Sequence, residues 1–137
     1  MSQRLNPYLN FDGNTREAME FYQNALGGEL LIHTFGEYGA PEGIDPNGVM
    51  HAMLETPAGF TLMASDLPPG MDGIQGTMMN VSISGEDEEA LRGYWDKLSD
   101  GANIVMPLEK QMWGDTFGSL FDKFGTPWMV NIVQNQQ

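Results

Sequence analysis

An internal repeat constrains the fold of this 137-residue chain more than any other feature. The segment FDGNTREAMEFYQNAL (11–26) matches ISGEDEEALRGYWDKL (83–98) at a constant offset of 72 residues. Further along, residues 59–63 match 125–129 at an offset of 66, so the first copy carries about six extra residues, which we assign to the loop 36–48. Self-similarity of this kind indicates two copies of one supersecondary unit.

Each copy is predicted to run strand, helix, strand, strand, strand, because runs of alternating polarity flank one capped, amphipathic segment. We expect Asn14 or Thr15 to cap the first helix, Ser84 or Glu86 to start the second, and glycines to end both. The predicted strands are 6–11, 29–35, 49–55 and 60–65 in the first copy, and 78–84, 104–109, 116–121 and 128–133 in the second.

The two copies are expected to form a single domain, 1–137, because one four-stranded copy alone leaves a sheet face bare. Module one then spans 4–66 and module two spans 77–134. The linker 67–76 is rich in proline and glycine, which disfavour a regular element.

Alternation along the strands sorts side chains into two faces. Leu9, Phe11, Val81 and Ile83 are expected to pack under the helices. The opposite face mixes thioethers with amides and hydroxyls, which suits a small-molecule pocket or, equally, a sheet face closed by a partner subunit. Its members are Asn6, Tyr8, Asn10, Thr61, Met63 and Ser65 in the first copy, and Met78, Asn80, Ser82, Pro127, Met129 and Asn131 in the second.

Charge and composition narrow the function classes. The formal net charge of −13 disfavours nucleic acid as a partner. The chain has no cysteine and no apolar run long enough for a membrane span or a signal peptide, so we expect a cytoplasmic protein. Without a cysteine or a serine in a GxSxG elbow, no nucleophile is indicated, and the catalytic residues stay unknown.

Two βαβββ copies joined by such a linker resemble the vicinal oxygen chelate superfamily, which includes glyoxalase I, extradiol dioxygenases and bleomycin-resistance proteins. The stretches PYLNFDGNTREAMEFYQNALGGELL, MHAMLETPAGFTLMASD and WGDTFGSLFDKFGTPWMVN are similar to its PhnB-like branch. The resemblance implies an α+β, glyoxalase-like fold. In it the two modules form a U-shaped, partly open eight-stranded mixed sheet around a cavity, often as a homodimer.

Enzymes of this superfamily usually hold a divalent metal through the first and last strands of each module, with His, Glu or Gln side chains. Carried over to this chain, those positions are Asn6, Met63, Met78 and Met129. Three thioethers and an amide do not suit a hard metal ion, and at best they would attract copper(I). The resemblance therefore predicts no metal at these positions, and no cofactor is expected. A register change of one residue brings in Pro7, Leu62, Met79 and Trp128, which serve no better.

Neither of the two histidines falls in an HxH or HExxH spacing. His51 shares a predicted strand face with Met53 and Glu55. If that face lines the cavity, His51 is the candidate for proton transfer or substrate orientation, and the alternative is a hydrogen-bonded structural histidine. His33, on the neighbouring predicted strand, is assigned a structural role.

The segment 107–125 concentrates aromatic residues around glycines. Trp113, Asp115 and Phe117 share one strand parity, so they predict an aromatic wall with one carboxylate facing the cavity. The alternative is that the aromatic residues belong to the core. The full set of candidate substrate-binding residues is Tyr8, His51, Met53, Met63, Met78, Asn80, Trp113, Asp115, Phe117, Met129 and Asn131.

Three functions follow from these observations. The first is a small-molecule-binding protein of this superfamily without the usual metal ligands. The second is a glyoxalase- or dioxygenase-type enzyme with a displaced metal site near His51, Glu55 or Asp115. The third is a dimeric protein without catalysis, either a scaffold or a bleomycin-resistance-like protein that sequesters a cationic antibiotic.

Overall fold

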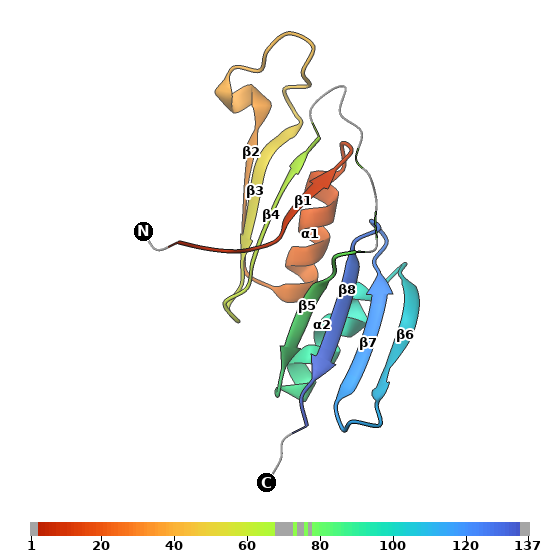
Figure 1. Ribbon diagram of the computed structural model, residues 1–137. Helices are drawn as coiled ribbons and strands as arrows, with labels where there is room; N and C mark the ends of the chain where they lie inside the picture. Colours follow the sequence, from red (N-terminus) through yellow and green to blue (C-terminus); the bar gives the residue numbers. More distant parts are fainter. Residues whose placement is uncertain (1–2, 68–72, 74–75, 77, 135–137) are drawn as a thin grey trace. The chain divides into compact units, whose positions relative to one another are not determined.

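Each copy of the repeat folds into one helix packed on one face of a four-stranded mixed sheet, as a computed structural model shows (Figure 1). The structure describes residues 3–67, 73, 76 and 78–134. It divides into two compact units, Met1–Ile74 and Gln75–Gln137, which we treat one at a time.

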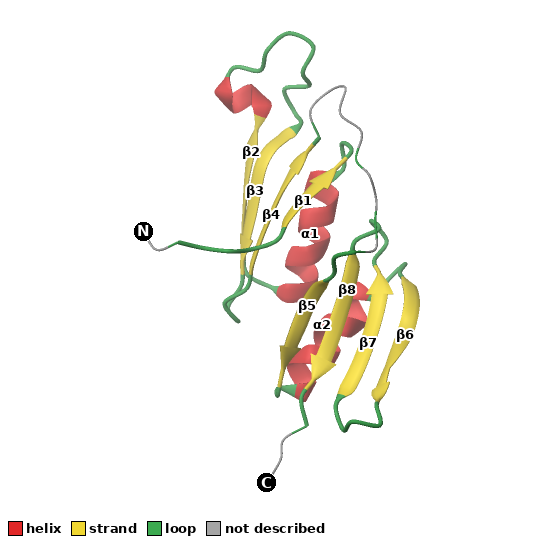
Figure 2. Ribbon diagram, viewed as in Figure 1, coloured by secondary structure: helices red, strands yellow, loops and turns green. Residues whose placement is uncertain are grey.

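In the first unit, helix α1 packs on strands β2, β3 and β4 (Figure 2). The sheet order is β1-β4-β3-β2, with β1 parallel to β4 and the other pairs antiparallel. The elements are β1 (Tyr8–Phe11), α1 (Thr15–Leu26), β2 (Glu29–Thr34), the short 3-10 helix η1 (Phe35–Tyr38), β3 (Val49–Glu55) and β4 (Thr61–Asp66).

The second unit repeats this plan. Its sheet order is β5-β8-β7-β6, again with one parallel pair, β5 with β8, and α2 packs on those two strands. The elements are β5 (Val81–Gly85), α2 (Glu88–Leu98), β6 (Asn103–Lys110), β7 (Thr116–Phe121) and β8 (Pro127–Ile132). The predicted α+β class and both βαβββ modules are therefore confirmed, as two four-stranded sheets. The U-shaped enclosure of a cavity stays a prediction.

The helix-facing side chains are those that strand alternation predicts. Phe11 and Ile83 are buried, whereas Leu9 and Val81 are half-buried. Apolar burial of this kind supplies most of the folding free energy of each module. The largest fully buried side chains include Trp128, Tyr22, Met19, Leu54, Leu98, Leu120, Val49 and Val130.

The helix starts differ in part from the expectation. Asn14 is the N-cap of α1, but its side chain makes no capping hydrogen bond. The N-cap of α2 is Asp87, whose side chain accepts a hydrogen bond from the Ala90 backbone N–H at 3.1 Å. Ser84 or Glu86 as the start of α2 was therefore wrong. Ser84 still belongs to β5, and Glu86 lies in the connection before the cap.

The offset of 66 in the second half of each copy is confirmed by matching turns. The backbone N–H groups of Thr56 and Asp122 bond to the carbonyl oxygens of Phe60 and Thr126 at 3.1 and 2.9 Å. The side chains of Thr56 and Asp122 then accept the backbone N–H of the same partners, at 3.1 and 3.0 Å. The β3–β4 and β7–β8 connections are thus one turn used twice.

The offset between β1 and β5 is 74 rather than 72. Leu67 N–H donates to Phe11 O at 2.8 Å, and the equivalent Val133 N–H donates to Gly85 O at 2.7 Å. By this count Asn80 takes the position of Asn6, so the match of Asn6 with Met78 was wrong by two residues. Since successive side chains alternate between faces, a shift of two leaves the predicted faces unchanged.

The buried carboxylate of Asp66 joins three elements of the first unit. Its Oδ1 accepts hydrogen bonds from the Thr15 backbone N–H at 3.2 Å and from the Thr15 hydroxyl at 2.6 Å, both at the start of α1. Its Oδ2 accepts the Val49 N–H at 2.8 Å, at the start of β3. Asp66 itself ends β4, so one side chain fixes where a helix and two strands meet.

Replacing Asp66 with alanine should lower the free energy of unfolding by about 3 kcal/mol, because buried donors on Thr15 and Val49 lose a charged acceptor. Urea unfolding at neutral pH measures the change. Asp12→Ala is the control: Asp12 is exposed just after β1, and its loss should cost no more than about 0.5 kcal/mol. Equal effects of the two substitutions would contradict the role of Asp66.

Two glycines should respond in opposite ways to alanine. A Cβ at Gly28, whose φ is +100°, would overlap the carbonyl oxygen of Glu55. Gly28→Ala should therefore cost at least about 2 kcal/mol. Gly93 lies in α2 with open space around its Cβ position, so Gly93→Ala should stabilise the chain by about 0.5–1 kcal/mol. Thermal unfolding of both variants checks the signs.

Candidate functional site

The helix-free face of the first sheet carries a row of half-exposed side chains, one from each strand. Tyr8 pairs with Met63, Met63 with Met53, and Met53 with Leu31. Directly paired residues point to the same side of a sheet, so the phenol, two thioethers and leucine are neighbours. This row brings together Tyr8, Met53 and Met63 from the predicted set.

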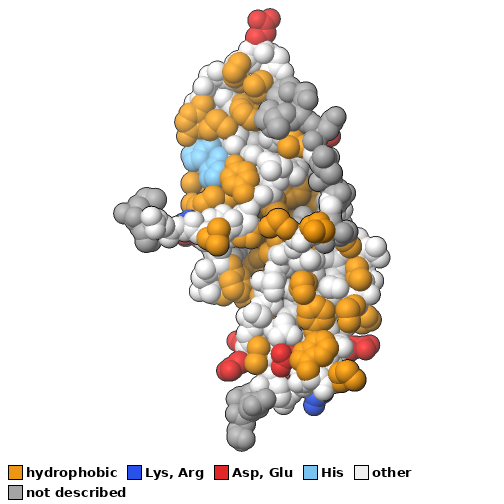
Figure 3. Space-filling view, viewed as in Figure 1, with side chains coloured by type: hydrophobic (Ala, Val, Ile, Leu, Met, Phe, Trp, Pro, Cys, Tyr) orange, Lys and Arg blue, Asp and Glu red, His pale blue; other side chains and the backbone are white. Residues whose placement is uncertain are grey.

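A second, more polar row lies beside the first on the same face. Asn10 pairs with Ser65, and the Ser65 hydroxyl donates to Asn10 Oδ1 at 3.3 Å. His51 pairs with His33 across β3 and β2. The Tyr8 hydroxyl lies 3.4 Å from His51 Nδ1, which links the two rows. Figure 3 shows the histidines as one continuous patch bordered by hydrophobic side chains.

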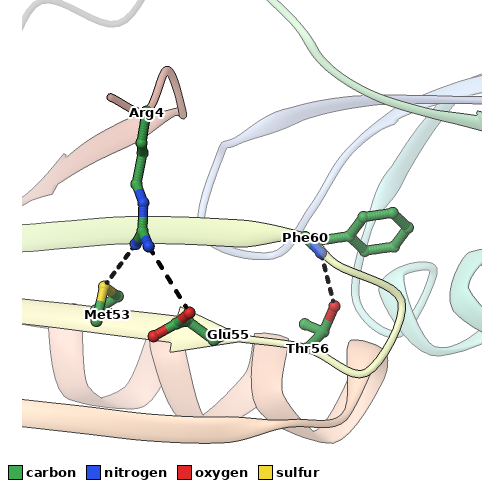
Figure 4. Close-up of polar contacts among 5 residues, drawn as sticks. All are labelled: Arg4, Met53, Glu55, Thr56 and Phe60. Carbon is green, nitrogen blue, oxygen red and sulfur yellow. Dashed lines mark hydrogen bonds and ion pairs between the residues drawn. The ribbon is translucent and has the colours of Figure 1, made fainter. Parts of the chain in front are cut away.

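Arg4 reaches over this face from the segment before β1 (Figure 4). Its Nη1 donates to Met53 Sδ at 3.3 Å, and its Nη2 lies 3.9 Å from Glu55 Oε2. Both charged side chains are roughly half exposed, so the ion pair contributes little to stability. Glu55 is thus paired with Arg4 rather than turned toward His51.

The helix-free face of the second sheet is built in the same way. Met129 lies between Ser82 and Ser119, its partners on β5 and β7. In the next row, Asn131 lies directly opposite Phe117. The predicted neighbours Met129, Asn131 and Phe117 therefore do share one face.

Asp115 is held at the edge of this face by two donors. Asn131 Nδ2 donates to its Oδ2 at 3.1 Å, and the Gln134 backbone N–H donates to its Oδ1 at 3.0 Å. The Gln134 N–H, and then the Asn131 amide, hold the pKa of Asp115 below its ordinary value of 3.8. The carboxylate is therefore both oriented and ionised at neutral pH.

Trp113 lies in the turn between β6 and β7, not on a strand. The residue is 61% exposed, and its ring centroid lies 6.4 Å from that of Phe117, with the planes inclined at 58°. Shared strand parity is thus not the reason that the two rings are close. The turn brings the indole close to the ring of Phe117 in β7.

Two predicted residues lie apart from these clusters. Met78 is 94% exposed in the segment before β5, and Asn80 is exposed one residue before that strand begins. Among the described residues, neither has a hydrogen bond or ion pair with another candidate.

The side chains at the superfamily's usual metal positions do not fit a hard metal ion. With the corrected register these are Asn6, Met63, Asn80 and Met129, two amides and two thioethers. The Asn6 amide donates to the neighbouring Pro7 carbonyl oxygen at 2.9 Å. In the described part of the chain, no three His, Cys, Asp or Glu side chains are grouped so that they could hold a metal ion. Thioethers favour soft ions, whereas Mg²⁺ and Mn²⁺ prefer oxygen.

Comparison with known proteins decides the family. A model of the Glyoxalase/Bleomycin resistance protein/Dioxygenase superfamily matches residues 4–130. The chain belongs to this superfamily. The glyoxalase-like fold and the superfamily predicted from sequence are thereby confirmed. No helix among the described residues is long and apolar enough to cross a membrane.

Individual relatives match this chain almost from end to end. It is 33% identical to protein YjdN of Escherichia coli K12, over 96% of this chain and 97% of that protein. Its structure is similar to the crystal structure of protein PA1353 from Pseudomonas aeruginosa, with a TM-score of 0.85, 35% identity, and coverage of 98% and 100% of the two chains. The PhnB protein from Bacillus cereus follows with a TM-score of 0.74, 26% identity, and coverage of 96% and 100%.

Sequence reasoning missed the neighbours of His51. It assigned His33 a structural role, which stays a prediction, and it did not foresee that the two histidines are cross-strand partners. The sequence does carry a signal, because His33 and His51 lie at equal distances before and after the middle of the loop 36–48. A loop of this length, however, does not fix the register between the two strands that it joins.

The pKa of Asp115 gives a direct test of this geometry. A ¹³C titration of the side-chain carboxyls should find it below 3.8 in the folded chain, and Asn131→Ala should raise it because one donor is removed. A lowered folded-state pKa stabilises the fold above the unfolded value, and this contribution is lost as pH falls through the folded value. Asp115→Asn should therefore lower stability at pH 7 but leave it unchanged at a pH below both values.

The control for this titration is Asn103→Ala, an exposed amide of the same module on β6. If Asn131→Ala leaves the pKa of Asp115 where it was, the amide does not orient the carboxylate.

Proposed function

We propose that this chain is a small-molecule-binding, PhnB-like member of the superfamily that does not use the usual metal positions. One observation carries the proposal: at one corner of module two, the fixed carboxylate of Asp115 adjoins the aromatic pair Trp113 and Phe117. Asn131 connects them, because it donates to Asp115 and lies directly opposite Phe117. Aromatic surface with one oriented polar group is a common way to hold a small organic molecule.

The chemistry of this corner favours a particular class of ligand. Each Asp115 oxygen accepts one hydrogen bond from the chain, so lone pairs remain for a donor on a ligand. The exposed indole of Trp113 offers a flat surface for ring stacking and for a cation. A flat organic molecule that carries an amine or a protonated nitrogen satisfies both groups.

The first module supports the proposal with a second mixed face. Met53 and Met63 give it a polarisable, adaptable surface, and the Tyr8–His51 contact adds a polar group that donates and accepts. Such surfaces adjust to different apolar ligands.

No step of a reaction is assigned to a metal at the usual positions, because two amides and two thioethers do not supply the hard ligands that such chemistry needs. A homodimer and a cytoplasmic location remain predictions for this chain.

The proposal predicts that aromatic amines raise the melting temperature of the full-length chain. A bound ligand at a hundred times its dissociation constant adds about 2.7 kcal/mol, which thermal unfolding detects readily. A panel should pair each aromatic amine with its uncharged analogue. Trp113→Ala and Asp115→Asn should each reduce the shift, and Asp115→Asn should affect the amines more than the uncharged analogues.

The matched controls are Met112→Ala, the neighbouring fully exposed residue of the same turn, and Asp96→Asn, an exposed acid on α2. Neither should change the shift. If no compound stabilises the chain, or if both controls act like the site variants, the proposed function is wrong.

A further inference from the structure

The two histidines of the chain are direct cross-strand partners on one sheet face. His33 on β2 pairs with His51 on β3. The Cβ atoms of directly opposed residues lie about 4.5–5.5 Å apart, and both side chains leave the sheet on the same side. Two imidazoles that start this close can reach one ion at the Zn–N distance of about 2.0–2.1 Å.

Each of the two rings has a polar group close to its Nδ1 atom. His33 Nδ1 lies 3.7 Å from Glu37 Oε1, and His51 Nδ1 lies 3.4 Å from the Tyr8 hydroxyl. Histidines that ligate a metal through one nitrogen usually bond the other to a carboxylate or another polar group, which fixes the ring. Among the described residues, neither Nε2 has a hydrogen bond, so both remain for an ion.

The carboxylate behind His33 is itself fixed. Glu37 Oε2 accepts the Thr34 backbone N–H at 2.6 Å, because Glu37 closes a capping box at the start of η1. The Tyr38 ring stands edge-on to His33, with centroids 5.8 Å apart. The His33 side chain is 32% exposed, which leaves the pair accessible to solvent while its neighbours restrict its motion.

We propose that His33 and His51 form a binding site for a borderline divalent transition-metal ion such as Zn²⁺, through their Nε2 atoms. The site lies on β2 and β3, whereas the superfamily's usual positions lie on the first and last strands of each module. It has two protein ligands, so water or a bound small molecule completes the coordination. The net charge of −13 favours the approach of a cation.

Isothermal titration of the untagged, full-length chain with ZnCl₂ tests the proposal. The expected stoichiometry is one ion per chain. His33→Gln and His51→Gln should each weaken binding at least about tenfold, because the second imidazole no longer adds an intramolecular contact. Tyr8→Phe should weaken it about tenfold through the orientation of His51. Glu55→Gln, on the same strand and face as His51, is the control for general attraction by acidic residues and should bind as the parent does.

Imidazole ¹⁵N spectra during the titration give an independent readout. Zn²⁺ should shift the signals of both histidines together and saturate at one equivalent, while circular dichroism shows that each variant is folded. The proposal is overturned if either single variant binds as tightly as the parent, if Glu55→Gln loses binding to the same degree, or if one ion binds per two chains. The site shares no residue with the Asp115 corner, so either proposal can fail alone.

Discussion

A helix of eleven or twelve residues covers only one face of a four-stranded sheet, and the other properties of this chain follow from that limit. Residues under α1 and α2 are apolar and buried, as one face of each sheet must be. A wholly apolar opposite face would favour aggregation, and a wholly polar one would offer no apolar surface for binding. Each therefore carries methionines among hydroxyls, amides and, in module one, imidazoles. The histidine pair lies on one of these faces, and the Asp115 corner lies at the edge of the other.

The two modules use buried aspartates at different places for the same purpose. Asp66 joins the starts of α1 and β3 to the end of β4, and Ile132 occupies the equivalent place in module two. Module two instead buries Asp122 in the β7–β8 turn, where it accepts from the Phe124 and Thr126 backbone and from the Trp128 indole. A buried carboxylate with every oxygen bonded fixes the local geometry more strictly than apolar packing does.

Sequence reasoning predicted what depends on local periodicity. The strands β3 and β7 have the predicted bounds, and the helix-facing residues are correct, because side-chain alternation has a fixed period of two. It did not predict what depends on register between strands or on turn geometry. The proximity of His33 to His51, the Asp87 cap, and the position of Trp113 in a turn all require knowing how loops close, and loop closure leaves little trace in composition.

The strands β1 and β5 match at an offset of 74, two more than the offset of 72 found in the sequence. This even difference indicates how two copies of one module can diverge. Slippage by an even number moves a strand along its partner and still presents the same side chains to the helix. Slippage by one residue would expose Phe11 or Ile83 and bury an asparagine or a serine in their place. Two copies of one module can therefore differ by steps of two within a strand, whereas insertions of one residue fit in loops. Residue-by-residue matching of two halves at a single offset therefore fails at the first strand even where the helices align.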